Sequence, residues 1–246
     1  MPKLELYLMG PPYVLWDGEP VTILRRQTRA LLFRLGTHLL PIARDRLAYQ
    51  FWADRPQNVA RRNLTHLLTH LREALPNDEV ITADTDQISL DPDLAWSDTA
   101  EFEQRAAVHG SCNIEELETT LRLYRRPFIS GFTLGHSTEY DEWAGQERCN
   151  WERLHQDLLK ELLEAYYDQG RYAEAIKVAH EYLRTNVLDE EIHQRLIELY
   201  ALTGDRAAAA NQYQTCAGAL REELGITPLR RTKYLYWAAL EGKLSP

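Results

Sequence analysis

The chain has 246 residues, of which 44% are hydrophobic and 26% charged, and its formal net charge is −9, as in a globular protein with one large or two smaller domains. No apolar run reaches the roughly 20 residues that cross a bilayer, and the amino terminus lacks the cationic start and apolar block of a secretion signal, so we expect no membrane partner and a cytoplasmic protein. Cys112, Cys149 and Cys216 are odd in number and form no CxxC pair, which argues against disulfides and a zinc cage, and we expect no cofactor.

The first part of the chain has the pattern of short strands. Leucines at every second position of 4–8 predict a strand with one buried face. A second strand is expected at Tyr13–Trp16, followed by the hairpin turn signal Asp17-Gly18 and a third strand at Val21–Leu24.

Three helices are expected next. Apolar residues of 30–35 are spaced for one helix face, and Arg44–Trp52 forms a second short helix after Pro41. Asn58 is expected to cap a third helix that runs to about Leu75.

A small hairpin completes this region. Val80–Thr82 and Gln87–Leu90 are expected to be two strands that flank a turn at 83–86. Strands, three helices and a terminal hairpin make a winged helix-turn-helix, in which the third helix enters the major groove of DNA.

The rest of the chain is helical and repetitive. Gly170 aligns with Gly204 and Tyr166 with Tyr200, each 34 residues apart, and 34 is the tetratricopeptide period. Two copies fit within 155–220, with flanking helices expected at 99–109, 114–124 and 228–241. The predicted fold class is therefore mainly α: a winged helix-turn-helix domain with a small β-sheet and a wing hairpin at 1–97, then an all-α tetratricopeptide-like domain at 98–246.

Positive charge is concentrated in one segment of this acidic chain. Ten arginines lie between positions 25 and 72, and only Asp45 and Asp54 oppose them. Residues 99–246, in contrast, hold 17 basic and 24 acidic side chains. A basic segment indicates a nucleic-acid partner; the alternative, a solvated face of paired charges, is disfavoured because so few acids are near.

The third helix has one apolar and one polar face. On a helical wheel its leucines share a single stripe, and the opposite centre holds Arg62, His66, Thr69 and Glu73. Arg61, Thr65 and Arg72 flank one side, and Asn63 and His70 flank the other. We expect the leucine stripe to pack against the first two helices and the polar face to remain outward.

The outward side chains are suited to DNA. Arginine grips guanine with two hydrogen bonds, and threonine offers a hydroxyl and a methyl group. The expected base contacts are Arg62, Thr65, His66 and Thr69, with His66 and Thr69 central. The expected phosphate contacts are Arg25, Arg26, Arg29, Arg44, Arg61 and Arg72.

Two other readings of this helix remain open. His66 and His70 have the i, i+4 spacing that can chelate a metal, but no HExxH motif or nearby third ligand supports a metal site. A solvated helix face that contacts nothing is the other alternative.

Two sets of motifs follow one another along the chain. The first domain contains Arg44-Asp45-Arg46-Leu47, Phe51-Trp52, Ala60-Arg61-Arg62-Asn63-Leu64, Leu71-Arg72 and Leu75. The second domain contains Leu121–Phe128, Trp143, Glu147-Arg148, Gly170, Ala175, Gly204 and LREELGITP at 220–228. In these motifs the chain resembles the SARP-type antibiotic-pathway regulators and their relatives, which join an OmpR-type winged helix to a bacterial transcriptional activator domain.

The resemblance implies a transcription factor, usually an activator, that binds double-stranded promoter DNA. It also implies that the second domain supports a homodimer or protein contacts, and that the turn at Ala53–Gln57 can touch RNA polymerase. One feature departs from this expectation, because the wing tip carries Asp84 and Asp86, whereas a wing that enters a minor groove favours Arg or Lys.

Two further classes of function compete with a DNA-binding regulator. The alternative is a tetratricopeptide-type interaction adaptor whose winged helix no longer binds DNA, which the net negative charge and the acidic wing tip favour. An enzyme is not expected, because no paired-carboxylate, Ser/His/Asp or metal pattern stands out.

Overall fold

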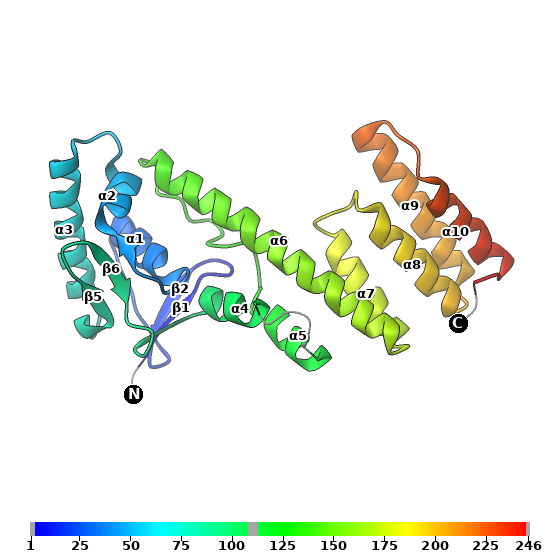
Figure 1. Ribbon diagram of the computed structural model, residues 1–246, viewed down its shortest axis with the longest axis horizontal. Coiled ribbons are helices and arrows are strands. Elements are labelled where there is room, and N and C mark those ends of the chain that lie inside the picture. Colours follow the sequence, from blue (N-terminus) through cyan, green and yellow to red (C-terminus); the bar gives the residue numbers. More distant parts are fainter. Residues whose placement is uncertain (1–2, 108–112, 245–246) are drawn as a thin grey trace. The chain divides into compact units, whose positions relative to one another are not determined.

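The computed structural model of the chain describes residues 3–107 and 113–244. It is mainly helical with two small sheets (Figure 1), which confirms the predicted fold class. The chain divides into two compact units, the first of residues 1–112 and 119–154 and the second of residues 113–118 and 155–246. No helix within the described ranges combines the length and the apolar character that a membrane span requires.

A four-stranded sheet opens the first unit, in the order β3-β2-β1-β7. Its strands are β1 (Leu4–Tyr7), β2 (Tyr13–Trp16), β3 (Glu19–Pro20) and β7 (Ala95–Ser97). β1 pairs antiparallel with β2 and parallel with β7. The predicted third strand at Val21–Leu24 was wrong. The Asp17-Gly18 turn, with positive φ at both residues, places Glu19 and Pro20 directly opposite β2, and Leu24 lies 87% exposed beyond the sheet.

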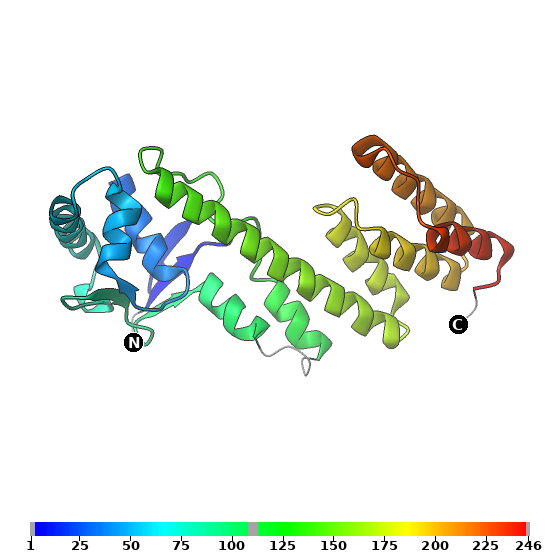
Figure 2. The ribbon, with the colours of Figure 1, turned by 45° about the horizontal axis from the view of Figure 1, so that its top comes forward.

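The winged helix-turn-helix follows. Its helices are α1 (Arg26–Gly36), α2 (Arg44–Trp52) and α3 (Gln57–Ala74). A short 3-10 turn, η1 (Asp78–Val80), leads into a three-stranded sheet in the order β4-β6-β5, formed by β4 (Ile42–Ala43), β5 (Ile81–Ala83) and β6 (Gln87–Leu90). Figures 1 and 2 show the β5–β6 hairpin, the wing, beside α3.

The third helix begins one residue earlier than predicted, and Asn58 does not cap it. Pro56 occupies the N-cap position with an extended backbone, and its carbonyl accepts hydrogen bonds from the N–H groups of Val59 and Ala60. Asn58 therefore lies inside the first turn. Because the proline ring fixes the φ angle, Pro56 directs the chain into the helix although no side chain accepts a capping hydrogen bond there.

The core of the first unit contains a buried arginine. Arg34, one of the ten arginines of the basic segment, is only 5% exposed. Its Nε donates to Gln50 Oε1 at 3.0 Å, and its guanidinium lies 4.6 Å from the ring centre of Trp143. Burial, together with the charge of Arg46, lowers the pKa of Arg34 to about 10. Arg34 therefore adds nothing to the surface charge.

The segment after the wing remains part of the first unit. β7 pairs with β1, and Ser97 then caps α4 (Asp98–Ala106) through its hydroxyl, which accepts from the Ala100 N–H at 3.1 Å. The sequence predicts this helix at 99–109, of which residues 108 and 109 lie outside the described ranges. The predicted division at 97/98 stays a prediction.

The second unit is a stack of helical hairpins. It contains the end of α6 (Thr138–Asp168), then α7 (Tyr172–Leu183), α8 (Glu190–Leu202), α9 (Arg206–Leu224) and α10 (Arg230–Glu241). Gly170 and Gly204, the aligned glycines, occupy equivalent turns with φ of 70° and 79°, where a side chain would be strained. The helix expected at 114–124 is the shorter α5 (Ile114–Leu121), and α10 starts at Arg230 rather than 228.

Candidate nucleic-acid interface

Helix α3 presents the polar face that its sequence predicts. Leu64, Leu67, Leu68 and Leu71 are at most 5% exposed. Arg62, Thr65, His66 and Thr69 are all exposed on the other side of the helix. The structure therefore brings the four expected base-contacting residues onto one accessible surface.

The hydroxyl groups of the two threonines on this surface already donate their protons within α3. Thr65 Oγ1 donates to the Arg61 carbonyl, and Thr69 Oγ1 donates to the Thr65 carbonyl, both at 3.1 Å. Each hydroxyl therefore offers lone pairs and each side chain offers its methyl group, so these threonines are suited to accept from a base or to contact a thymine methyl.

The edges of the α3 face carry an ion pair. Arg61 donates to both carboxylate oxygens of Asp45, at 2.5 and 2.7 Å, and this hydrogen bonding lowers the pKa of Asp45. His70 Nδ1 lies 3.3 Å from Glu73 Oε2, and Arg72 is half-buried. Arg61 is therefore only partly available to a phosphate, whereas Arg62 has no acid partner among the described residues.

The arginines at the start of α1 are held to different degrees. Arg25 is exposed and precedes the helix. Arg26 Nε donates to the Thr133 carbonyl at 2.5 Å, and its guanidinium lies 5.3 Å from the ring centre of Phe132. Arg29 also lies over Phe132, at 5.6 Å, and its Nε is buried without a hydrogen-bond partner.

Arg44 connects α2 to the tip of the wing. Its Nε donates to the Asp84 carbonyl at 2.6 Å, and its backbone N–H donates to the Asp86 carbonyl at 2.8 Å. The Asp84 carboxylate accepts from the backbone N–H groups of Gln87 and Asp86, and these bonds lower its pKa. The wing tip therefore stays negative, with one arginine beside it.

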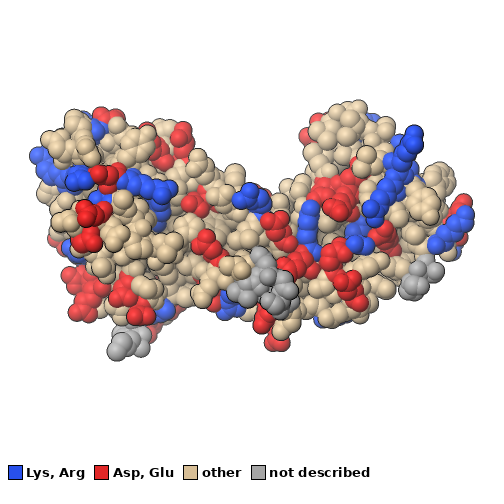
Figure 3. Space-filling view, in the orientation of Figure 1, with Lys and Arg blue, Asp and Glu red and all other residues tan. Residues whose placement is uncertain are grey.

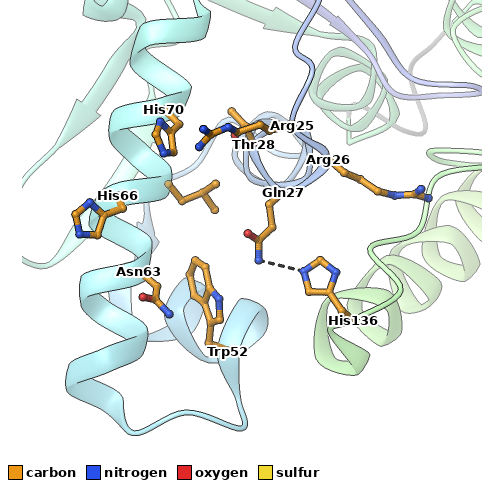
Figure 4. Close-up of a pocket in the computed structure, with 10 residues that line it drawn as sticks. Arg25, Arg26, Gln27, Thr28, Trp52, Asn63, His66, His70 and His136 are labelled. Atoms are coloured by element: carbon orange, nitrogen blue, oxygen red, sulfur yellow. Dashed lines mark hydrogen bonds between the residues drawn. The ribbon is translucent and has the colours of Figure 1, made fainter.

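A cleft of about 580 Å³ lies beside α3. It is lined by Arg25, Arg26, Gln27, Thr28, Trp52, Asn63, His66, Leu67, His70 and His136. Figure 4 shows these side chains, with Gln27 Nε2 and His136 Nε2 joined at 3.1 Å. Sequence reasoning named half of this set, since Arg25, Arg26 and His66 are expected DNA contacts and the wheel places Asn63 and His70 on one flank of α3. It did not find Gln27, Thr28 or His136, because nothing local connects His136 to residues more than 60 positions earlier.

Arginine and acidic side chains are interspersed over this region. Figure 3 shows blue basic side chains on the side of the molecule that holds α2 and α3, with red acidic side chains beside them. His66 and His70, which have the spacing of a metal-chelating pair, lack a third ligand: among the described residues no three His, Cys, Asp or Glu side chains converge. The arrangement offers arginine and amide donors to an anionic partner.

Comparisons with known proteins agree with this architecture. The family model described as "Bacterial transcriptional activator domain" matches residues 98–240, which is more than half of the chain. A search of curated proteins finds no match.

One solved structure has the same fold. EmbR of Mycobacterium tuberculosis, solved in complex with a low-affinity phosphopeptide, superposes with a TM-score of 0.71 at 22% sequence identity. The likeness covers 98% of this chain and 66% of the EmbR chain, so the chain spans just under two thirds of the length of that protein. The family match supports one assignment, with which the shared fold agrees: this chain belongs to the bacterial transcriptional activator domain family, a family of regulators and not of enzymes.

Proposed function

We propose that this chain regulates transcription, as an activator, by placing α3 in the major groove of double-stranded promoter DNA. The observation that carries the proposal is the outward face of α3, where Arg62, Thr65, His66 and Thr69 are exposed while the leucines opposite them are buried. Helix-turn-helix proteins read base edges with such a face. Arg62 takes the principal role, because its guanidinium has no acid partner among the described residues and can grip guanine.

The phosphate contacts frame this face. Arg25, Arg26, Arg29, Arg44, Arg61 and Arg72 are the proposed donors. Arg25 is exposed and its guanidinium has no hydrogen-bond partner among the described residues, whereas Arg61 gives up its bond to Asp45 when it turns to a phosphate. Such contacts position the protein but carry no sequence information.

The helical-repeat domain is proposed to make protein contacts, including a homodimer. Tyr234 and Trp237 lie 66% and 60% exposed on α10, and large exposed aromatic side chains are typical of protein interfaces. The exposed turn between α2 and α3, Ala53–Gln57, is the proposed contact with RNA polymerase. Measuring the molecular mass of the complex with DNA tests the homodimer, because the mass gives the number of copies of this chain that bind one DNA site.

The test of DNA reading is Arg62→Ala. We expect it to weaken binding to the chain's own upstream region by about 1–3 kcal/mol, while binding to random DNA changes much less, because a bidentate contact to guanine is lost. Mobility shifts on the two DNAs measure both affinities. Arg153→Ala, at an exposed position in α6, is the matched control; equal losses on both DNAs would remove Arg62 from base reading.

The test of phosphate contact is Arg44→Ala. We expect the slope of log K against log salt to flatten by about one unit, because one phosphate loses its counter-charge. Arg44→Lys is the matched control, since it keeps the charge but loses the guanidinium bond to the Asp84 carbonyl. An unchanged slope in the alanine variant would show that Arg44 serves only to hold the wing.

The same titrations distinguish the adaptor alternative. The acidic wing tip, at Asp84 and Asp86, is the observation that favours it. An adaptor shows no salt-sensitive binding to any DNA and instead binds a peptide through the helical repeats.

A further inference from the structure

The cleft beside α3 has features that base reading does not use. Its walls come from the start of α1, the end of α2, the middle of α3 and the loop that holds His136. In Figure 4, Gln27 and His136 form one side, Trp52 and Asn63 the lower side, and His66 points away from the centre. The cleft is thus adjacent to the outward face of α3 rather than part of it.

The lining of this cleft suits an anion. None of its ten lining residues is an aspartate or a glutamate, whereas two are arginines and three are histidines. Arg25 is exposed at the rim. Arg26 is held by the Thr133 carbonyl, so Arg25 is the arginine left for a ligand, and no carboxylate of the lining opposes an anion there.

The amino terminus of α1 opens into the same cleft. The helix has 11 residues, and its first three, Arg26, Gln27 and Thr28, all line the cleft. The N-cap residue, Arg25, supplies no side-chain hydrogen bond to the first turn. The first N–H groups of a helix lack intrahelical acceptors and carry partial positive charge, so they favour a bound anion.

A second observation points to a ligand independently of the helix end. Thr28 is only 1% exposed, and its Oγ1 has no hydrogen-bond partner. A buried hydroxyl without a partner is unfavourable and calls for an explanation. A ligand oxygen in the cleft, accepting from Thr28 and from the amide groups beside it, would provide one.

We propose that this cleft is a phosphate-binding site, formed by the first-turn amides of α1, the Thr28 hydroxyl and Arg25. Phosphate supplies several acceptor oxygens and the negative charge that the carboxylate-free lining favours. Two kinds of ligand contain such a phosphate group: the phosphodiester of a DNA backbone and a free phosphate ester. The DNA source rests on the function proposed above, and it is favoured because Asn63, His66 and His70 of α3 line the same cleft.

The experiment begins with inorganic phosphate and no DNA. The full chain, labelled with ¹⁵N, is titrated with phosphate at constant ionic strength, and chloride serves as the reference anion. We expect the amides of Arg26, Gln27 and Thr28 to shift in a saturable manner, with about tenfold weaker binding in Thr28→Val, since a hydrogen bond to a charged group is lost. Removal of an unpartnered hydroxyl leaves the fold intact. Arg25→Gln is a second variant, and Thr215→Val, at an exposed threonine of α9, is the control.

The second arm repeats the comparison with DNA. If a backbone phosphate occupies the cleft, Thr28→Val weakens the upstream and random duplexes by the same factor, about three- to tenfold, because phosphate contacts are independent of sequence. If phosphate binds but the variant leaves both duplexes unaffected, the DNA source is overturned and a free phosphate ester remains. If no duplex binds at all, the proposed function fails while the first arm still reports on the site. Amides that do not respond to phosphate, or respond equally in Thr28→Val, overturn the site itself.

Discussion

Replacement of Asp98 with alanine is expected to lower the free energy of unfolding by about 3–5 kcal/mol. Asp98 is 1% exposed, and its carboxylate accepts from the backbone N–H groups of Leu8 at 2.7 Å and Met9 at 3.0 Å. It also accepts from Arg125 Nη2 at 3.0 Å. Alanine leaves two N–H groups of fully buried residues without an acceptor, and each such loss is costly. Urea titration of wild type and variant measures the difference.

Two further substitutions sharpen this prediction. Asp98→Asn keeps one carbonyl oxygen in the same place and should recover part of the loss. Asp157→Ala, at an exposed position of α6, should change stability by less than about 0.5 kcal/mol. A loss below about 1 kcal/mol in Asp98→Ala would show that the N–H groups of Leu8 and Met9 find other acceptors.

The stability that His38 contributes is expected to depend on pH. His38 Nδ1 lies 2.8 Å from Glu103 Oε2, its Nε2 lies 3.3 Å from Glu147 Oε2, and its ring stacks on Trp151. Burial lowers the pKa of His38, but the hydrogen bonds and charges of Glu103 and Glu147 raise it more, to about 9 from 6.5. The protonated ring therefore stabilises the fold fully below pH 6.5, and this contribution, about 3 kcal/mol, declines as the pH rises through 9.

The measurement compares wild type with His38→Gln by urea unfolding at about pH 6, pH 8 and pH 9.5. The stability difference should be largest at the lowest pH and nearly vanish at the highest. Glu103→Gln removes one of the two partners and should move the decline to lower pH. A difference that stays constant across this range would show that His38 acts through packing on Trp151 and not through its charge.

The elements that the sequence predicted well are those with local periodic patterns. Three examples are the leucine stripe of α3, the helix at Arg44–Trp52 and the strand at Tyr13–Trp16. In each, the spacing of apolar residues along the sequence matches the period of the observed helix or strand. The 34-residue period located the turns at Gly170 and Gly204 for the same reason. In contrast, β7 is three residues long and pairs with β1 from about 90 positions away, so no local pattern marked it.

The sequence alone therefore determined which face of α3 is outward, and that a winged helix-turn-helix precedes the helical repeats. Hydrophobic periodicity decides which side of an element is buried, and it can be read from neighbouring residues. Only the tertiary structure showed that Arg34 is buried against Gln50 and Trp143, and that Asp45 holds Arg61. It also brought His136 to the start of α1, beside the unpartnered hydroxyl of Thr28. Such contacts join residues that are distant in the chain, and the free energy of a buried polar group depends on these neighbours rather than on its own position in a pattern.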